Sequence, residues 1–229
     1  MLYKDRRDAG KKLASKLIHY KNREDTLVLA LPRGGVVVGD EIARVLHCPL
    51  DIIIIRKIGA PMQPELAIGA ISETGTVVLN QDIISVYGIS EQYIKREISR
   101  QKEEIARRIS LYRGGKGITS VGGKVIILVD DGVATGATIK AAIETLKREK
   151  ISRLVAALPV SSVSAQSDIK DMVDEWICLQ SPSNFMAVGG YYEDFTQVTD
   201  EEVVEILTLE SSSQNFKERY APGNRGIQG

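Results

Sequence analysis

An unbroken apolar run from Val125 to Val129 ends in two acidic residues and a loop of small residues, and this stretch constrains the fold more than any other. A run without polar alternation is typical of a strand buried on both faces, as in a parallel sheet covered by helices. A helical pattern follows at residues 139–147. The carboxyl ends of such strands are where α/β sheets bind ligands. The stretch therefore predicts a ligand-binding strand end in an α/β fold.

The loop after this strand has the chemistry of an anion site. Small residues let backbone N–H groups approach an anion closely, and the helix that follows directs its positive end to the same place. Asp130 and Asp131 stand directly before the loop and do not suit a phosphate, so their expected partners are hydroxyl groups or a metal ion. A phosphorylated sugar meets both demands. The alternative is a tight strand-to-helix turn in which Asp and Thr act only as caps.

Residues 125–138 resemble the phosphoribosyl-pyrophosphate (PRPP) signature of type I phosphoribosyltransferases, in which apolar residues precede an acidic pair and a small-residue loop ending in Thr. The resemblance implies that Asp130 and Asp131 bind the ribose hydroxyls, directly or through a cation, with Mg²⁺ as cofactor. It also implies that residues 134–138 hold the 5-phosphate. The implied PRPP contacts of the loop are Gly132, Val133, Ala134, Thr135, Gly136, Ala137 and Thr138.

The predicted strand at residues 26–31 ends in a second loop suited to an anion. It reads Pro-Arg-Gly-Gly, and the N–H groups of Gly34 and Gly35, with the guanidinium of Arg33, can hold a diphosphate. The same residues also suit a simple turn into the helix predicted at residues 36–46, with Arg33 solvated. In the resembled family a short loop after the first core strand binds pyrophosphate. That position makes Arg33 a candidate catalytic residue.

Arg56 and Lys57 follow an apolar run at residues 51–55, which we predict to be the next parallel strand. Residues 56–59 are similar to the Arg-Lys-x-Gly segment of adenine-type phosphoribosyltransferases, whose Arg approaches the pyrophosphate. A charged strand end is the plainer alternative. A site for several phosphate oxygens needs convergent cations, and the Arg fork engages two oxygens at once. We therefore count Arg56 and Lys57 among the candidate catalytic residues.

Strands and helices alternate along the chain, which predicts an α/β fold with one doubly wound parallel sheet and flanking helices. Residues 59–123 interrupt this alternation as a flap or insertion. Within it the patterns predict a hairpin of residues 67–72 and 76–80, a long charged helix at 90–112 and a flexible basic loop at 113–117. In the resembled family a mobile flap at this point closes over the sugar. A contact within a dimer is the other use we expect.

The C-terminal part is predicted to form a small hood at about residues 181–198. In the resembled family the hood recognises the base or other nucleophile, and aromatic faces stack on bases while carboxylates accept hydrogen bonds from them. Packing of the aromatic residues on the sheet edge is the alternative. A closing helix is expected at 200–209 and a disordered tail at 210–229, so residues 1–209 make a single predicted domain. The hood candidates are Phe185, Tyr191, Tyr192, Glu193 and Asp194.

The charge balance narrows the class of partner. The chain has 30 Lys and Arg against 30 Asp and Glu, which gives no bulk attraction to nucleic acid, so we expect no such partner. Cys48 and Cys178 are far apart and histidines are few, which argues against a zinc site and a disulfide framework. No apolar run approaches membrane-spanning length, and the N-terminal residues show no apolar signal segment. We expect a cytoplasmic protein without a membrane partner.

Together with the resemblance, these features predict a Mg²⁺-dependent phosphoribosyltransferase that transfers the 5-phosphoribosyl group of PRPP to a nitrogen nucleophile, such as a nucleobase, and releases pyrophosphate. Ala134 stands where the hypoxanthine-guanine branch has an acidic residue, which disfavours 6-oxopurine salvage. The chain is most similar to standalone predicted phosphoribosyltransferases that carry Leu-Pro-Arg-Gly-Gly, Arg-Lys-x-Gly and Tyr-Glu-Asp-Phe. Family analogy implies a homodimer or a higher homo-oligomer.

A PRPP-binding regulator without transferase activity is the alternative function, with a basic patch as its contact surface. A P-loop nucleotide hydrolase is excluded, because Ile118 occupies the position where the Gly-x-x-x-x-Gly-Lys motif requires its first glycine. The residues that would seed the regulator's basic patch are Arg107, Arg108, Arg113 and Lys116.

Overall fold

A computed structural model of the chain describes residues 2–209, and its centre is a five-stranded sheet. The strands are β1 (Thr26–Ala30), β2 (Leu50–Ile52), β6 (Val125–Val129), β7 (Arg153–Val160) and β8 (Glu175–Gln180). They lie in the order β2-β1-β6-β7-β8, and every pairing is parallel. The predicted α/β class with a central parallel sheet is confirmed.

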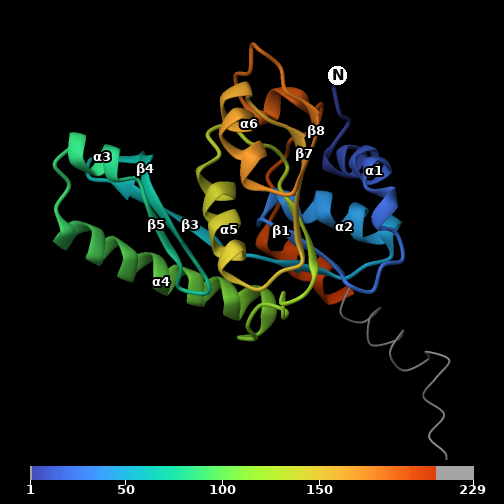
Figure 1. Cartoon of the computed structure of the whole chain (residues 1–229), viewed down its shortest axis with the longest axis horizontal. Coiled ribbons are helices and arrows are strands. Elements are labelled where there is room, and N and C mark those ends of the chain that lie inside the picture. Colours follow the sequence, from blue (N-terminus) through green and yellow to red (C-terminus); the bar gives the residue numbers. More distant parts are fainter. Residues whose placement is uncertain (1, 210–229) are drawn as a thin grey trace, which may run out of the picture.

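Helices cover both faces of this sheet. They are α1 (Arg6–Lys16) and α2 (Gly34–Leu46) on one side, and α5 (Ala137–Arg148) and α6 (Val163–Ile169) on the other (Figure 1). Val28 and Ala30 of β1 belong to the core under α1 and α2, whereas Leu27 and Leu29 belong to the core under α5 and α6. Successive side chains of a strand point to opposite faces. A strand without polar positions is therefore buried on both sides.

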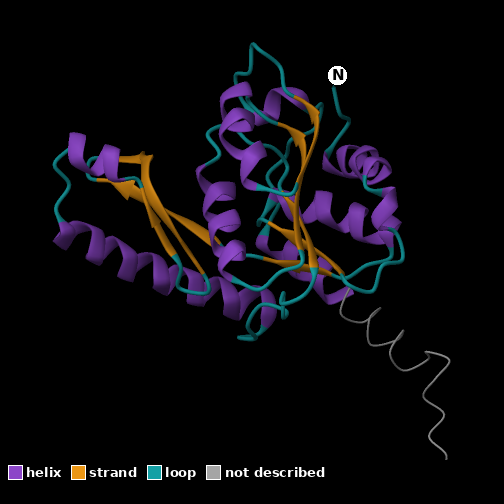
Figure 2. Cartoon of the chain, viewed as in Figure 1, coloured by secondary structure: helices purple, strands orange, loops and turns teal. Residues whose placement is uncertain are grey.

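The insertion forms an arm beside the central sheet, and α5 packs between the two (Figures 1 and 2). Its elements are β3 (Ile55–Ala60), β4 (Gln63–Ser72), β5 (Val77–Leu79), α3 (Gln81–Val86) and α4 (Glu91–Arg113). The three strands are antiparallel, so the predicted hairpin is confirmed as β4 and β5. The long helix is confirmed as well: the Ser90 hydroxyl accepts from the N–H of Tyr93 at its start, and Gly114 ends it at φ 58°.

Short helical turns and a closing helix complete the described chain. The turns are η1 (Ile18–Tyr20), η2 (Lys170–Met172) and η3 (Val188–Tyr191), and residues 200–209 are helical as predicted. The tail predicted at residues 210–229 lies outside the described part. Within residues 2–209, every helix is too short or too polar to cross a lipid bilayer.

The strand predicted at residues 51–55 is wrong in its extent. β2 stops at Ile52, and β3 begins at Ile55 in a different, antiparallel sheet. The N–H of Ile54 bonds to Oε1 of Glu73 in the turn after β4, which turns the chain out of the parallel sheet. Residues 52–55 are four buried isoleucines, so hydrophobicity could not mark the change of partner. Arg56 and Lys57 consequently lie inside β3 and not at the end of a parallel strand.

The flexible basic loop predicted at residues 113–117 is wrong at its first residue. Arg113 ends α4 with a side chain only 9% exposed, ion-paired to Glu73 and 4.0 Å from Oδ1 of Asp51. The other oxygen of Asp51 accepts from the N–H of Thr119. Burial raises the pKa of Glu73, and the Arg113 guanidinium opposes that shift. The buried cluster of Arg113, Glu73 and Asp51 therefore joins the arm to the edge of the central sheet.

Replacement of Arg113 tests this attachment. Arg113→Ala leaves Glu73 and Asp51 buried without their cation, and we expect a loss of about 3 kcal/mol in the free energy of unfolding, measured in urea. Arg107→Ala is the matched control, because its exposed pair with Glu104 on the same helix is worth less than about 1 kcal/mol. Equal losses in the two variants would contradict the anchoring role.

Candidate functional site

Two of the predicted loops meet at the carboxyl edge of the central sheet, because β1 and β6 are neighbours with Ala30 opposite Val129. The glycines after β1 pack directly on the acidic pair after β6. A Cβ atom at Gly34 would lie 1.8 Å from Oδ2 of Asp131, and one at Gly35 would lie 2.9 Å from the Cα of Asp130. No side chain fits at either position, so the packing requires both glycines.

The two carboxylates differ sharply in their surroundings. Oδ1 of Asp130 accepts from the N–H of Asp131 at 2.8 Å. Burial, and next the charge of Asp131, raise the pKa of Asp130 well above its usual range. Asp131 instead forms an ion pair of 2.7 Å with Nε of Arg6. One carboxylate of the pair is therefore neutralised by a fixed cation, and the other is held at an energetic cost.

Arg6 was not singled out by the sequence, although it is bound tightly at this site. It comes from the first turn of α1, is 8% exposed, and donates to the carbonyl oxygen of Thr196 at 2.8 Å. Its guanidinium carbon lies 3.9 Å from the centre of the Phe195 ring, a cation–π contact. An Arg among the Lys and Arg residues of an amphipathic helix carries no signal for a partner that lies 125 positions away.

The small-residue loop after Asp131 is held from its outer side. The N–H of Val133 bonds to the carbonyl of Val160, and the Ser162 hydroxyl donates to the carbonyl of Ala134 at 2.6 Å. Ala134 and Thr135 are exposed, and Gly136 takes a left-handed φ of 77° directly before α5. This geometry presents the tip of the loop and the start of a helix to solvent, as an anion site requires.

A cavity of about 410 Å³ adjoins this loop and is rich in cations. Pro32 and Thr138 line it from the two sheet loops. Its basic residues are Arg56 and Lys57 of β3 with Arg100 and Arg108 of α4. Burial, followed by the charge of Arg108, lowers the pKa of Arg56, as expected where cations converge. The cavity is therefore suited to an anion that carries several charges.

The sequence analysis did not predict that α4 contributes side chains to this cavity. Gln101 is 7% exposed and its side-chain oxygen accepts from Nε of Arg56 at 2.9 Å, which fixes the guanidinium. Arg33 does not line the cavity. Its Nη1 lies 3.7 Å from Oδ1 of Asp200. The structure thus brings Arg56 and Lys57 together with the Thr138 loop, and holds the Arg33 side chain elsewhere.

The predicted hood residues divide into three groups. Phe185 and Tyr191 stack with ring centres 5.5 Å apart, and both are partly exposed. Tyr192 is buried, and its hydroxyl donates to the carbonyl oxygen of Asp131 at 2.5 Å, so it holds the backbone of the acidic pair. Glu193 and Asp194 are exposed, and Asp194 accepts from the N–H and hydroxyl of Thr196.

Comparison with known proteins places this geometry in a family. Residues 2–196 match the model of the phosphoribosyl transferase domain. The chain belongs to this family. Two proteins from strains of Mycobacterium tuberculosis, whose names assign them provisionally as phosphoribosyl transferases, are 40% identical over 206 residues, or 90% of this chain and 46% of their own length. The chain thus spans about half the length of these curated relatives.

A solved structure shares the fold of this phosphoribosyl transferase domain. The crystal structure of TT1426 from Thermus thermophilus is 43% identical, with a TM-score of 0.78, and the match covers 90% of this chain and 98% of that one. The similarity extends through the central sheet and the arm, since it includes nearly the whole of both chains.

The acidic pair of this phosphoribosyl transferase domain generates a test in which substitution of the two carboxylates changes stability in opposite directions. A carboxyl whose pKa is raised by folding holds its proton more tightly in the folded state, so stability falls as the pH rises from the unfolded-state pKa through the folded one. Asp130→Asn keeps the acceptor for the Asp131 N–H and removes the buried charge. We expect it to raise the free energy of unfolding at pH 7.5 by about 1 kcal/mol, with the gain disappearing below about pH 4.

Asp131→Asn is the matched variant, because it removes the charge that pairs with buried Arg6. We expect it to lower the free energy of unfolding by about 2 kcal/mol at pH 7.5. Thermal denaturation in metal-free buffer across the pH range measures both effects. Shifts of the same sign in the two variants would show that the carboxylates share one environment.

Proposed function

We propose that the chain transfers the 5-phosphoribosyl group of PRPP to a nitrogen nucleophile, releasing pyrophosphate. The observation that carries the proposal is the convergence of three elements at one sheet edge: an acidic pair, a phosphate-type loop and a cation-lined cavity bounded by both loops. PRPP carries a monophosphate and a diphosphate on opposite ends of a sugar with two hydroxyls. Each part has a chemically suited partner here.

The acidic pair is assigned to the ribose. Carboxylate oxygens accept hydrogen bonds from hydroxyl groups. Arg6 holds the side chain of Asp131 in place, and Tyr192 holds its backbone carbonyl. Residues 134–138 are assigned to the 5-phosphate, because an exposed loop tip directly before the start of α5 suits a dianion. The N–H groups of Gly34 and Gly35, close to the pair, are assigned to the first phosphate of the diphosphate.

The cations of the cavity are assigned to the diphosphate. Arg56 is oriented by Gln101, and Lys57 extends from the same strand. Arg100 and Arg108 of α4 are additions that the structure brings to this group. Because the arm supplies these side chains, the flap role predicted for residues 59–123 is favoured over a contact within a dimer.

Mg²⁺ suits the donor set of this site. In the described residues no group of three or more His, Cys, Asp or Glu side chains forms a metal cage. Mg²⁺ commonly binds through one or two carboxylates plus substrate phosphates, and Asp130 and Asp131 offer that number beside the proposed diphosphate site. When bound, the ion would neutralise charge on the leaving diphosphate. The raised pKa of Asp130 would then fall, because a neighbouring cation favours the carboxylate.

The reaction breaks the bond between the anomeric carbon and the diphosphate oxygen, while the nitrogen nucleophile forms the new bond at that carbon. Positive charge grows on the sugar ring and negative charge on the leaving diphosphate. Arg56, Lys57 and the glycine N–H groups stabilise the leaving group, and the acidic pair fixes the sugar. The partly exposed faces of Phe185 and Tyr191 are our candidates for stacking with a nucleobase acceptor.

The alternative function, a PRPP-binding regulator, receives no support from the basic patch predicted for it. Arg113 is buried in its ion pair with Glu73, and Arg107 and Arg108 both pair with Glu104.

A test of the transferase function separates it from the regulator. Pyrophosphate release from PRPP and Mg²⁺ is followed against purine bases, pyrimidine bases and small amines. Acceptor-dependent release supports a transferase, whereas tight PRPP binding without release with any acceptor supports a regulator.

The cavity assignment has its own test. Arg56→Ala removes the guanidinium that Gln101 orients, and we expect Mg²⁺-pyrophosphate to bind roughly 10- to 100-fold more weakly, as for loss of a charge-assisted hydrogen bond. Ribose 5-phosphate should keep its affinity within about twofold, since its phosphate is assigned to residues 134–138. Calorimetry measures both ligands.

Arg96→Ala is the control for the Arg56 experiment, because Arg96 is an exposed cation on α4 outside the cavity lining. It should change neither affinity by more than about twofold. Equal losses for pyrophosphate and ribose 5-phosphate in Arg56→Ala would contradict the assignment of the cavity to the diphosphate.

A further inference from the structure

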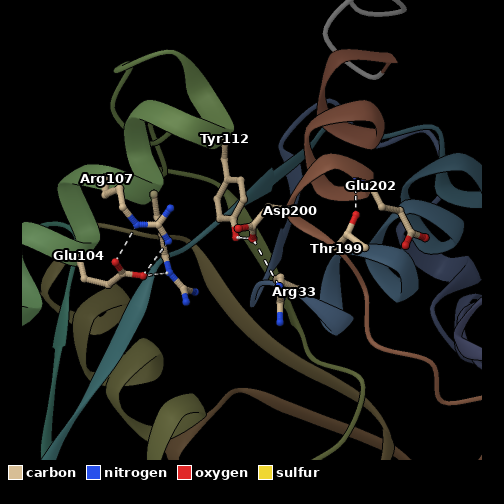
Figure 3. Close-up of polar contacts among 8 residues, drawn as sticks. Arg33, Glu104, Arg107, Tyr112, Thr199, Asp200 and Glu202 are labelled. Carbon is tan, nitrogen blue, oxygen red and sulfur yellow. Dashed lines mark hydrogen bonds and ion pairs between the residues drawn. The ribbon is translucent and has the colours of Figure 1, made fainter.

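Arg33, the cation of the Pro-Arg-Gly-Gly loop, faces a carboxylate of the closing helix and not the cation-lined cavity. Its Nη1 lies 3.7 Å from Oδ1 of Asp200, the first residue of the helix at 200–209 (Figure 3). Asp200 lies beyond residues 2–196, the part of the chain that matches the family model. The pair therefore joins a loop within the matched domain to a helix outside it.

Asp200 is held in position by a hydrogen bond and by its place at the start of a capped helix. The Tyr112 hydroxyl, from the end of α4, donates to Oδ1 of Asp200 at 2.5 Å (Figure 3). Burial, followed by this bond to Asp200, raises the pKa of Tyr112 to about 12, so the hydroxyl remains a donor at neutral pH. The Thr199 hydroxyl accepts from the N–H of Glu202 and caps the helix, whose positive end favours a carboxylate at its first residue.

The closing helix itself cannot move freely, because its apolar side is part of the main core. Val203 is fully buried there, and Ile206 and Leu207 are nearly so. The Tyr112 side chain is 5% exposed in the same core. Arg33 and Asp200, by contrast, keep 31% and 29% of their side-chain surface exposed. A fixed carboxylate thus meets a cation that solvent and ligands can reach.

We propose that Asp200 is a positioning residue that competes with diphosphate for Arg33, and so weakens the hold of the site on pyrophosphate. This inference rests on the proposed function, in which the diphosphate lies against the N–H groups of Gly34 and Gly35, and Arg33 precedes them in the same loop. A diphosphate that binds the Arg33 guanidinium must first separate it from Asp200. This cost opposes binding of the diphosphate end of PRPP and of released pyrophosphate.

The competition between Asp200 and diphosphate affects the release of pyrophosphate. Many cations hold a diphosphate tightly, and slow release of this product limits the turnover of a transferase. A carboxylate that competes for one of these cations lowers the affinity for pyrophosphate and leaves the ribose and 5-phosphate contacts unchanged. Because the arm supplies Tyr112 and the closing helix supplies Asp200, the position of both elements determines the strength of this competition.

Asp200→Asn tests the proposal, because the amide keeps an acceptor for Tyr112 and removes the charge. We expect Mg²⁺-pyrophosphate to bind about fivefold more tightly to the variant, measured by calorimetry, as for removal of a partly exposed ion pair. Ribose 5-phosphate affinity should change by less than about twofold. In turnover, inhibition by pyrophosphate should strengthen by a similar factor, which a purely structural role would not produce.

A double-mutant cycle and a charge control make the result specific. In an Arg33→Ala background the effect of Asp200→Asn should fall below about twofold, since no shared cation remains. Glu201→Gln removes an exposed charge from the same helix and should leave pyrophosphate affinity within about twofold. A gain that persists without Arg33, or that Glu201→Gln reproduces, would overturn the proposal in favour of general repulsion.

The unsubstituted chain separates failure of this inference from failure of the proposed function. If it binds Mg²⁺-pyrophosphate and Asp200→Asn binds no more tightly, the competition is refuted while the function stands. If it binds neither PRPP nor Mg²⁺-pyrophosphate, the proposed function and the role of Asp200 are refuted together.

Discussion

The parallel pairing of β1 with β6 is the constraint on which the site depends. It sets Ala30 opposite Val129, and the N–H of Leu31 continues the ladder with a bond of 2.8 Å to the carbonyl of Val129. Both strands therefore end at the same level. The glycine loop and the acidic pair that follow must then occupy one small volume, and only residues without a Cβ fit opposite the carboxylates.

That arrangement places two carboxylates side by side, and the rest of the fold compensates for their charges unequally. Arg6 neutralises Asp131, and Tyr192 bonds to its backbone, whereas Asp130 keeps only the N–H of its neighbour among the contacts described. A site that is strained electrostatically before it meets a ligand is typical of function. The cation that relieves the strain at Asp130 would have to arrive with the substrate.

Local patterns were sufficient for most strands of the central sheet and for the positions of the two loops after β1 and β6. The strand at Val125–Val129, the long helix capped by Ser90 and the closing helix all carry periodicity or capping signals that act over a few residues. What the sequence could not reveal depends on pairs far apart in the chain. Arg6 with Asp131, and Arg113 with Glu73, look like ordinary surface charges until the fold brings the partners together.

The change of sheet after Ile52 had the widest consequence, because it moved Arg56 and Lys57 from a strand end into the arm. Those cations now face α4, so the cation-lined cavity lies between the sheet edge and the arm. Arg113 at one end of α4 ties the arm to the sheet through a buried cluster, and Tyr112 beside it reaches Asp200. The last turn of α4 therefore carries both the attachment of the arm and the hydroxyl that holds the partner of Arg33, so the position of the arm and the ion pair of the glycine loop depend on the same few residues.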